Sequence, residues 1–216
     1  MKRRDLLAAV AALPVVAAGK KPKAKAEVSP GEDLMREHGV LNRVLLVYDE
    51  TARRLEGQED PRTDVLAAAA ALIRRFIEGY HEKLEEAQLF PRFEKAGKLV
   101  ELVSVLRQQH AAGRRVTDEI VKLAVPGIVG AGRIQLAGSL RKFVRMYRPH
   151  EAREDTVLFP AFHDLVGQKE YERLGEQFED EEHKLLGEGG FEKAVAEVAQ
   201  LEQALGIFDL AKFTPP

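Results

Sequence analysis

Apolar residues recur at steps of three and four along four long stretches of this chain, a spacing that predicts amphipathic α-helices. We expect helices that begin just after residue 30, at about 62–95, at about 99–124, and in a stretch that includes 136–157. Segments rich in glycine and proline separate these stretches. Strand signals are absent, so the pattern predicts an all-α fold.

Short segments between long helices favour antiparallel neighbours, so the four helices predict an up-down-up-down four-helix bundle. The pattern then predicts a shorter helix at about 170–186 and another at 191–205. These last ~50 residues are too few for a core of their own and are expected to pack on the bundle. The predicted organisation is therefore a bundle with a covering helix at 29–187 and a C-terminal helical tail at 188–216.

One histidine lies in the core-facing series of each long helix. These four residues are His38, His81, His110 and His150. A single histidine at such a position is usually a hydrogen-bonded core residue. Four of them at similar depths along antiparallel helices are expected to meet in the interior of the bundle.

A thirteen-residue motif that starts at His81 occurs again 69 residues later at His150, with seven identical positions. The identical positions include a glutamate four residues after the histidine, Glu85 or Glu154. On a helix this spacing places imidazole and carboxylate on one face, about 6 Å apart along the axis. One such pair is usually solvated, but a duplicate that keeps its polar residues indicates a metal site. The Leu-Phe-Pro that follows in each copy is interpreted as structural, because proline bends or ends a helix.

The 216 residues include no cysteine and no tryptophan. Thiolate sites, iron–sulfur clusters and disulfides are therefore excluded, and any metal must be held by imidazole and oxygen. Four imidazoles and two carboxylates buried without partners would cost several kcal/mol each, and a metal ion removes that cost. Carboxylates that can bridge favour two ions, with iron or manganese as the best match. The formal net charge of −2 does not indicate a nucleic-acid partner.

The first residues are of a different kind. Lys2-Arg3-Arg4 precedes a run of thirteen apolar residues at 6–18, which is too short to span a bilayer comfortably and ends in the small residues of a cleavage site. This stretch resembles a twin-arginine export signal. We therefore expect residues 1–28 to be a signal peptide and linker, the protein to be periplasmic, and no membrane span to remain after cleavage. An amphipathic or anchoring first helix, including an uncleaved anchor, is the alternative.

Together, these motifs resemble the hemerythrin-like, or HHE cation-binding, family over about residues 33–187. The resemblance implies a four-helix bundle around a non-haem, carboxylate-bridged centre of two iron ions. Carried over position by position, it implies terminal ligands to one iron from His38 and His81, terminal ligands to the other from His110 and His150, and bridging carboxylates from Glu85 and Glu154.

The chain departs from the oxygen-carrying members of that family at two places. They have a fifth histidine four residues after the one on the third helix, where this chain has Arg114. They also use an aspartate five residues after the last histidine, so Asp155 competes with Glu154 as the bridging ligand. Glu82 and Glu151, each next to a motif histidine, are further candidates, and the resemblance to four-histidine members makes Glu82 a candidate metal ligand.

Three functions are compatible with such a site. The first is a protein that binds dioxygen, peroxide or nitric oxide for storage, delivery or sensing, at a coordination position left open by the missing histidine. The alternative is a di-iron enzyme that oxidises iron or consumes peroxide. The third is a bundle that a metal such as zinc merely stabilises. Ferritin-like iron oxidases are disfavoured, because they use Glu-x-x-His and this chain has His-x-x-x-Glu.

Overall fold

Ser29 and Pro30 start the first long helix. The Ser29 hydroxyl accepts a hydrogen bond from the backbone N–H of Glu32, and Pro30 takes the first helical position, where its missing N–H costs nothing. The computed structural model describes residues 28–215, which form helices and no strands, so the all-α prediction is confirmed. The predicted signal peptide at 1–28 lies almost entirely outside the described residues.

The helices lie within a few residues of the predicted bounds. The first is α1 (Pro30–Glu56), and the third is α5 (Val100–Leu123). The second is a continuous run of α2 (Thr63–Leu72), the π-helix η1 (Ile73–His81), α3 (Glu82–Leu84), the π-helix η2 (Glu85–Leu89) and α4 (Phe90–Ala96). The fourth is a run of α6 (Ala131–Arg153), the π-helix η3 (Glu154–Leu158) and α7 (Phe159–Val166). They are followed by α8 (Gln168–Leu186), α9 (Gly190–Leu205) and the 3₁₀ turn η4 (Leu210–Phe213).

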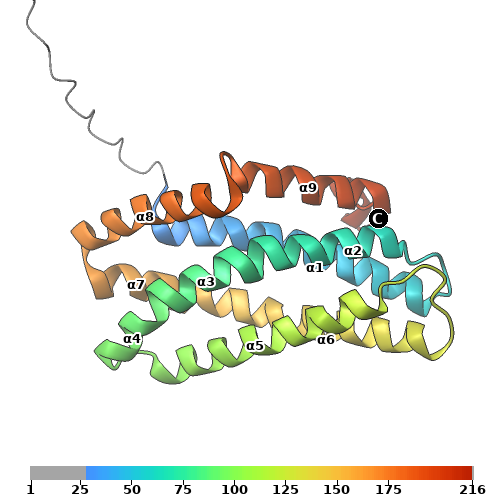
Figure 1. Ribbon diagram of the computed structural model, residues 1–216, viewed down its shortest axis with the longest axis horizontal. Helices are drawn as coiled ribbons and strands as arrows, with labels where there is room; N and C mark the ends of the chain where they lie inside the picture. Colours follow the sequence, from blue (N-terminus) through green and yellow to red (C-terminus); the bar gives the residue numbers. More distant parts are fainter. Residues whose placement is uncertain (1–27, 216) are drawn as a thin grey trace, which may run out of the picture.

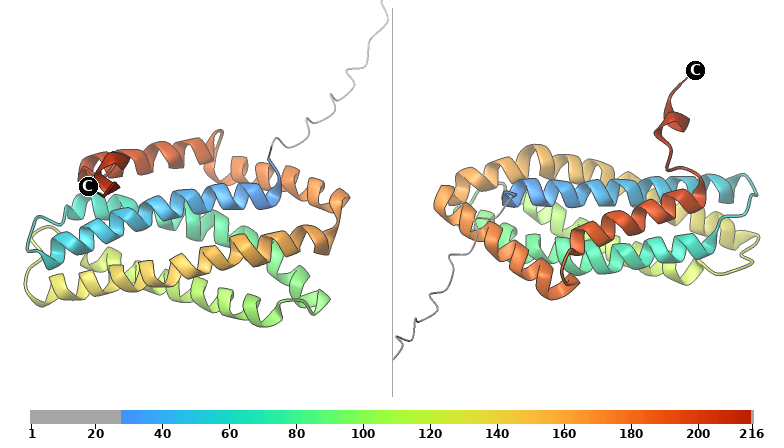
Figure 2. Two further views of the ribbon diagram at one scale, coloured as in Figure 1. Left: turned by 180° about the vertical axis from the view of Figure 1, so that it is seen from behind. Right: turned by 90° about the horizontal axis from the view of Figure 1, so that it is seen from above.

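The long helices lie side by side, as Figures 1 and 2 show. Helix α6 packs along both α1 and α5, while the second run packs against α1 and α5. Helices α8 and α9 lie over one side of this arrangement, where α9 contacts α1 and α2 and α8 contacts α7 and α1. The tail helix thus packs on the other helices, as the small size of this segment predicts.

Local conformation explains where the second run ends. Gly97 has φ +65° and ends it, as the sequence predicts, because glycine tolerates the left-handed conformation of a helix C-cap. Leu99, just before α5, also has positive φ. This pair of residues reverses the chain within a very short segment.

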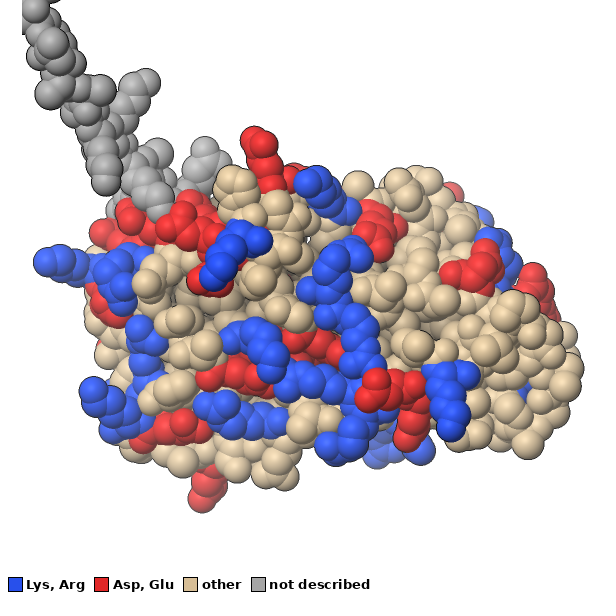
Figure 3. All heavy atoms as spheres, viewed as in Figure 1, with Lys and Arg blue, Asp and Glu red and all other residues tan. Residues whose placement is uncertain are grey.

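The face drawn in Figure 3 has no single charged field, and the described helices include no membrane-spanning segment. Figure 3 shows basic and acidic side chains interspersed over the face that it draws. Among residues 28–215, none of the helices is long and apolar enough to cross a bilayer. The large apolar side chains are instead concentrated in the core that surrounds the four histidines.

Candidate metal centre

The four histidines meet in the interior of the protein, as their positions in the apolar series predict. They are buried almost completely, with exposed fractions of 2% for His38, 2% for His81, 0% for His110 and 3% for His150. The rings of His38 and His81 lie 4.7 Å apart, and those of His110 and His150 lie 5.1 Å apart. The imidazoles therefore form two pairs, each with one ring from a motif helix and one from a helix without the motif.

Two buried carboxylates link these pairs. Each has an oxygen near the Nε2 atoms of one histidine from each pair: Glu85 Oε2 lies 3.6 Å from His81 and 3.4 Å from His110, and Glu154 Oε2 lies 3.4 Å from His38 and 3.0 Å from His150. A carboxylate in this position can ligate an ion in either pair. Each carboxylate thus lies between the two histidine pairs.

The donor atoms at the centre lack partners within the protein. Both carboxylate oxygens of Glu85 and of Glu154, together with Nε2 of His110, are buried and form no hydrogen bond. A buried polar atom left unpaired costs about 1–3 kcal/mol, and more when it is charged. A cation satisfies all of these atoms at once, and imidazole with carboxylate suits iron, manganese or zinc. The residues present therefore fit a metal centre.

Three groups of three described side chains have ligand atoms within 4.8 Å of one another, and two of them consist of the main candidates. These two are His38 with His81 and Glu85, and His110 with His150 and Glu154. The six residues that the sequence singles out as main candidates thus come together, and they fall into the same histidine pairs that the family resemblance implies.

The second nitrogen of each ring is held by an outer acceptor. The four Nδ1 contacts are His38 to Asp155 (2.7 Å), His81 to Glu37 (2.6 Å), His110 to Glu86 (3.2 Å) and His150 to Gln109 (2.9 Å). An acceptor at Nδ1 fixes the proton there and leaves the lone pair of Nε2 for a metal. All four rings therefore present Nε2 to the centre.

The structure separates Glu154 from Asp155. Glu154 lies in the centre and is fully buried, whereas the side chain of Asp155 is 33% exposed and lies at the outer edge of His38. Glu86 takes the same position in the first copy of the motif, since it also follows the central glutamate and accepts from an isolated histidine. Asp155 is thus an outer partner in this arrangement.

Sequence reasoning missed three of the outer partners: Glu37, Glu86 and Gln109. Glu37 and Gln109 directly precede the histidines of α1 and α5, and each accepts from a motif histidine on another helix. The sequence does show that both residues adjoin a core histidine. Which histidine each of them contacts depends on how the helices are rotated against each other, and the sequence does not give that rotation.

Glu82 is buried beside the centre and is held by two donors. It accepts hydrogen bonds from the Tyr147 hydroxyl at 2.7 Å and from the Arg114 guanidinium at 2.6 Å. Arg114 also forms an ion pair with Glu86 at 2.6 Å. Glu82, Glu86 and His110 have ligand atoms close enough to hold an ion, but the guanidinium already pairs with both carboxylates. Arg114 therefore stands where the oxygen carriers have a fifth histidine, and it pairs with two carboxylates instead.

The second copy of the motif has a neutral version of this contact. Glu151, which corresponds to Glu82, accepts a hydrogen bond from the side chain of Asn42. Asn42 follows His38 by four residues, as Arg114 follows His110. The same offset thus supplies an amide in one half of the centre and a guanidinium in the other.

Glycine at position 113 makes room for Tyr147. A Cβ atom on Gly113 would lie 2.0 Å from the Tyr147 hydroxyl oxygen, which is far inside van der Waals contact. Only glycine therefore allows the phenol to reach Glu82 from α6. Gly39, the other small residue beside a core histidine, has open space around it.

The Leu-Phe-Pro tails cover the isolated histidines. Phe90 stacks on His110 with ring centres 5.5 Å apart, and Phe159 stacks on His38 at 5.4 Å. The chain stays helical through both prolines, so neither ends the helix. A π-turn instead begins at each central glutamate and ends just before the phenylalanine. A proline with no N–H to place is well suited to close such a shift in hydrogen-bond register.

The protonation of the centre follows from these contacts. Burial lowers the pKa of His38 and of His110, but the negative charge of the two carboxylates beside each ring outweighs it, raising the pKa of His38 well above its usual range and that of His110 to about 10. Burial lowers the pKa of His81 to about 4. Without a metal, two imidazolium rings therefore balance the central carboxylates.

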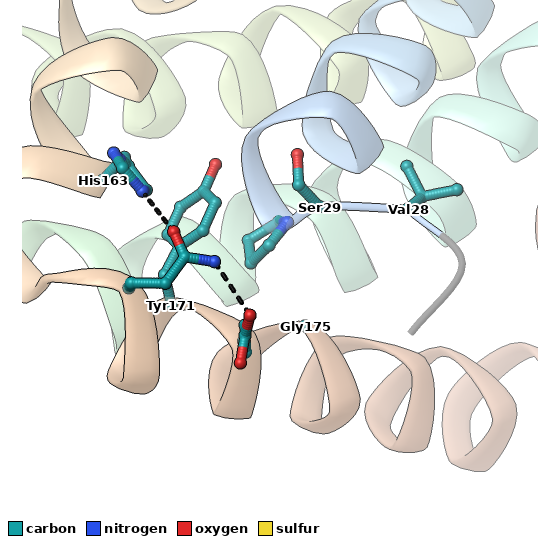
Figure 4. Close-up of a pocket in the computed structure, with 8 residues that line it drawn as sticks. Val28, Ser29, His163, Tyr171 and Gly175 are labelled. Carbon is teal, nitrogen blue, oxygen red and sulfur yellow. Dashed lines mark hydrogen bonds between the residues drawn. The ribbon is translucent and has the colours of Figure 1, made fainter. Parts of the chain in front are cut away.

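The two remaining histidines take no part in the centre. His163 and His183 are exposed, as their surroundings in the sequence predict. His163 lines a separate pocket of about 270 Å³ between the start of α1 and α8, together with Ser29 and Tyr171 (Figure 4). None of the candidate ligands lines this pocket.

Comparison with known proteins gives a family match for the part of the chain that contains the first copy of the motif. The family model for the hemerythrin HHE cation binding domain matches residues 29–128. Uncharacterized proteins of Mycobacterium bovis and Mycobacterium tuberculosis are 47% identical over 196 residues, which cover 90% of this chain and 77% of theirs. No solved structure matches the chain.

Proposed function

We propose that the chain is a member of the hemerythrin HHE cation-binding family, whose model matches residues 29–128, and that it is a non-haem di-iron protein that binds dioxygen, peroxide or nitric oxide. The observation that carries the proposal is the crosswise position of the two central carboxylates. In the proposal, His38 and His81 hold one iron, His110 and His150 hold the other, and Glu85 and Glu154 bridge them.

The side chains around the centre have definite tasks in this proposal. Bound iron would supply reversible redox chemistry and an open coordination position for the small ligand. The outer acceptors orient the four rings through Nδ1. Phe90 and Phe159 stack on two of the rings and keep water from their faces. Arg114 and Tyr147 hold Glu82 beside the second pair of histidines, and Arg114 stands where the oxygen carriers have a fifth histidine.

One observation favours an enzyme as the second candidate. The buried hydroxyl of Tyr147 donates to Glu82, and its ring lies 5.4 Å from that of His150. A phenol next to a carboxylate that can take its proton can give one electron to an oxidant bound nearby, while the proton passes to Glu82; an external one-electron reductant would then return the tyrosyl radical to tyrosine. This supports a peroxide-consuming or iron-oxidising activity as the alternative.

The proposal extends to topology and location. It includes the up-down-up-down order of the four long helices, which the packing of α6 between α1 and α5 supports. It also includes organisation as a bundle at 29–187 with a tail at 188–216, and export to the periplasm through a twin-arginine signal, which the sequence of the first 18 residues supports.

The decisive experiment combines metal analysis with optical spectra of the full chain. We expect two irons per chain and a visible band on exposure to air. Reversal of that band under vacuum supports a carrier, whereas repeated consumption of peroxide supports the enzyme. Fewer than two irons per chain contradict the di-iron proposal, and stoichiometric zinc without a visible band indicates a purely structural metal.

A further inference from the structure

The two halves of the candidate centre correspond position by position. The first half contains the pair His38 and His81, and the second contains the pair His110 and His150. Around them, corresponding residues occur at equal offsets from these histidines: Asp155 with Glu86, Glu37 with Gln109, Glu151 with Glu82, and Asn42 with Arg114. The first and third of these correspondences keep an acidic residue, while the second and fourth pair residue types of different formal charge.

In the first half, both rings donate to a carboxylate. The Nδ1 atom of His38 lies 2.7 Å from Asp155, and that of His81 lies 2.6 Å from Glu37. Within residues 28–215, neither acid forms an ion pair with a lysine or arginine. Asn42, which corresponds to Arg114 of the second half and donates to Glu151, is neutral. Three acids, Asp155, Glu37 and Glu151, therefore surround this half, and no described lysine or arginine side chain is bonded to any of them.

In the second half, the outer charge is largely cancelled. His150 donates to Gln109, which is neutral. His110 contacts Glu86, but that carboxylate also pairs with Arg114 at 2.6 Å and with Lys83 at 2.9 Å. The same guanidinium pairs with Glu82. The second half thus has two outer acids, Glu82 and Glu86, where the first half has three. The partly buried guanidinium of Arg114 is bonded to both of them.

This difference acts on the ions through the rings. A carboxylate at Nδ1 makes the imidazole a stronger donor at Nε2, and nearby negative charge stabilises a more highly charged ion. A guanidinium close by does the opposite. Changes in such outer partners typically alter metal affinity by about 10–100-fold. Since the inner ligands of the two halves are chemically identical, the outer layer decides between the two ions.

We propose that the two metal positions are unequal: the position at His38 and His81 binds its ion more tightly and favours the higher oxidation state, and the position at His110 and His150 holds the weaker, lower-charged and more readily exchanged ion. This inference rests on the proposed two-ion function. Gln109 and Arg114 are the positioning residues that set the inequality.

The test is a titration of the metal-free full chain with Co²⁺, whose visible bands report each ion as it binds. We expect two steps that differ by about tenfold or more in affinity. Gln109→Glu places in the second half an acid that corresponds to Glu37, and it should tighten only the weaker of the two binding steps. Arg114→Asn, which copies the residue at position 42, should have the same effect. The matched variant Glu37→Gln should weaken only the tighter step.

The outcomes separate this inference from the function on which it rests. Uptake of a single ion overturns the two-ion function and the inequality with it. Two ions of equal affinity, or variants that shift both steps together, overturn the inequality alone. The exchange of Glu and Gln at positions 37 and 109 in one double variant should narrow the difference between the two steps, since the acid then lies in the second half, where Arg114 still pairs with Glu82 and Glu86. Circular dichroism of each metal-free variant checks that the fold is kept.

Discussion

The inner and outer layers of the centre follow different rules. In the inner layer, both halves have the same residue types at the same offsets, two histidines and a glutamate. In the outer layer, an acid in one half corresponds to an amide in the other, and an asparagine corresponds to an arginine. The comparison teaches that direct ligation leaves little freedom of residue type, whereas hydrogen bonding to a ring nitrogen can be met by several types with different charges.

Removal of a central carboxylate should have the largest effect. Glu85→Ala and Glu154→Ala each take away a group that reaches both histidine pairs, so each is expected to lose at least one ion and to lower the affinity for the other by about 100-fold or more. Metal content after dialysis measures this. Glu94→Ala changes an exposed acid of the same helical run and should keep full occupancy, and full occupancy in the two central variants would contradict the bridging role.

A change of pH should affect the inner layer next most strongly. His38 and His110 carry protons in the metal-free protein, so metal binding must release them, and affinity should fall about tenfold per proton displaced for each unit of decrease in pH. The pH change in weakly buffered solution on addition of Co²⁺ measures this release. Binding without acidification at pH 7–8 would contradict it.

The same protons predict an opposite trend for the metal-free protein. The raised pKa values mean that the folded state binds protons more tightly than the unfolded state, where histidine titrates near 6.5. This stabilisation is complete below about pH 6.5 and is lost as pH rises toward about 10, the pKa of His110. Thermal unfolding of the metal-free protein should therefore occur at lower temperature as pH rises through this range.

The inner layer could be predicted from the sequence because it follows helical periodicity. His38 and His110 continue the apolar series of their helices, and the repeated motif singles out the other candidate ligands without any knowledge of the fold. Helix bounds were predictable for the same reason, and Gly97 ends its helix as expected. These features depend on local spacing, which a sequence states directly.

The outer layer could not be predicted, because its partners come from different helices. Whether Asp155 or Glu154 faces the centre depends on the rotation of a helix that contains a π-turn, which shifts every later side chain from the ordinary period of 3.6 residues. Arg114 could be read only as a missing histidine. Its pairing with Glu82 and Glu86 requires the distance between two neighbouring helices.

The two glycines beside core histidines should respond in opposite directions. In Gly113→Ala the new methyl group collides with the Tyr147 hydroxyl, so we expect a loss of about 1–3 kcal/mol in the free energy of unfolding. Gly39→Ala meets open space in an exposed helical position and should gain up to about 1 kcal/mol. Denaturant unfolding of both metal-free variants measures the difference. Equal stability of the two variants would show that Tyr147 adapts without cost.

The smallest expected effect concerns the acids beside the first half. Burial, followed by the charges of Glu37 and Glu182, raises the pKa of Asp33 to about 7. A raised pKa means that ionisation opposes folding, so this cost is absent below about pH 4 and grows as pH rises through about 7. Asp33→Asn should therefore raise the midpoint of thermal unfolding above pH 7 by a few degrees, about what 1 kcal/mol gives in a protein of this size, and should change nothing at pH 4. Asp164→Asn, at an aspartate whose side chain is 84% exposed, is the matched control and should show no such dependence. A gain for Asp33→Asn that is equal at pH 4 and pH 8 would mean that packing, rather than the crowding of acids on this side of the centre, sets the effect.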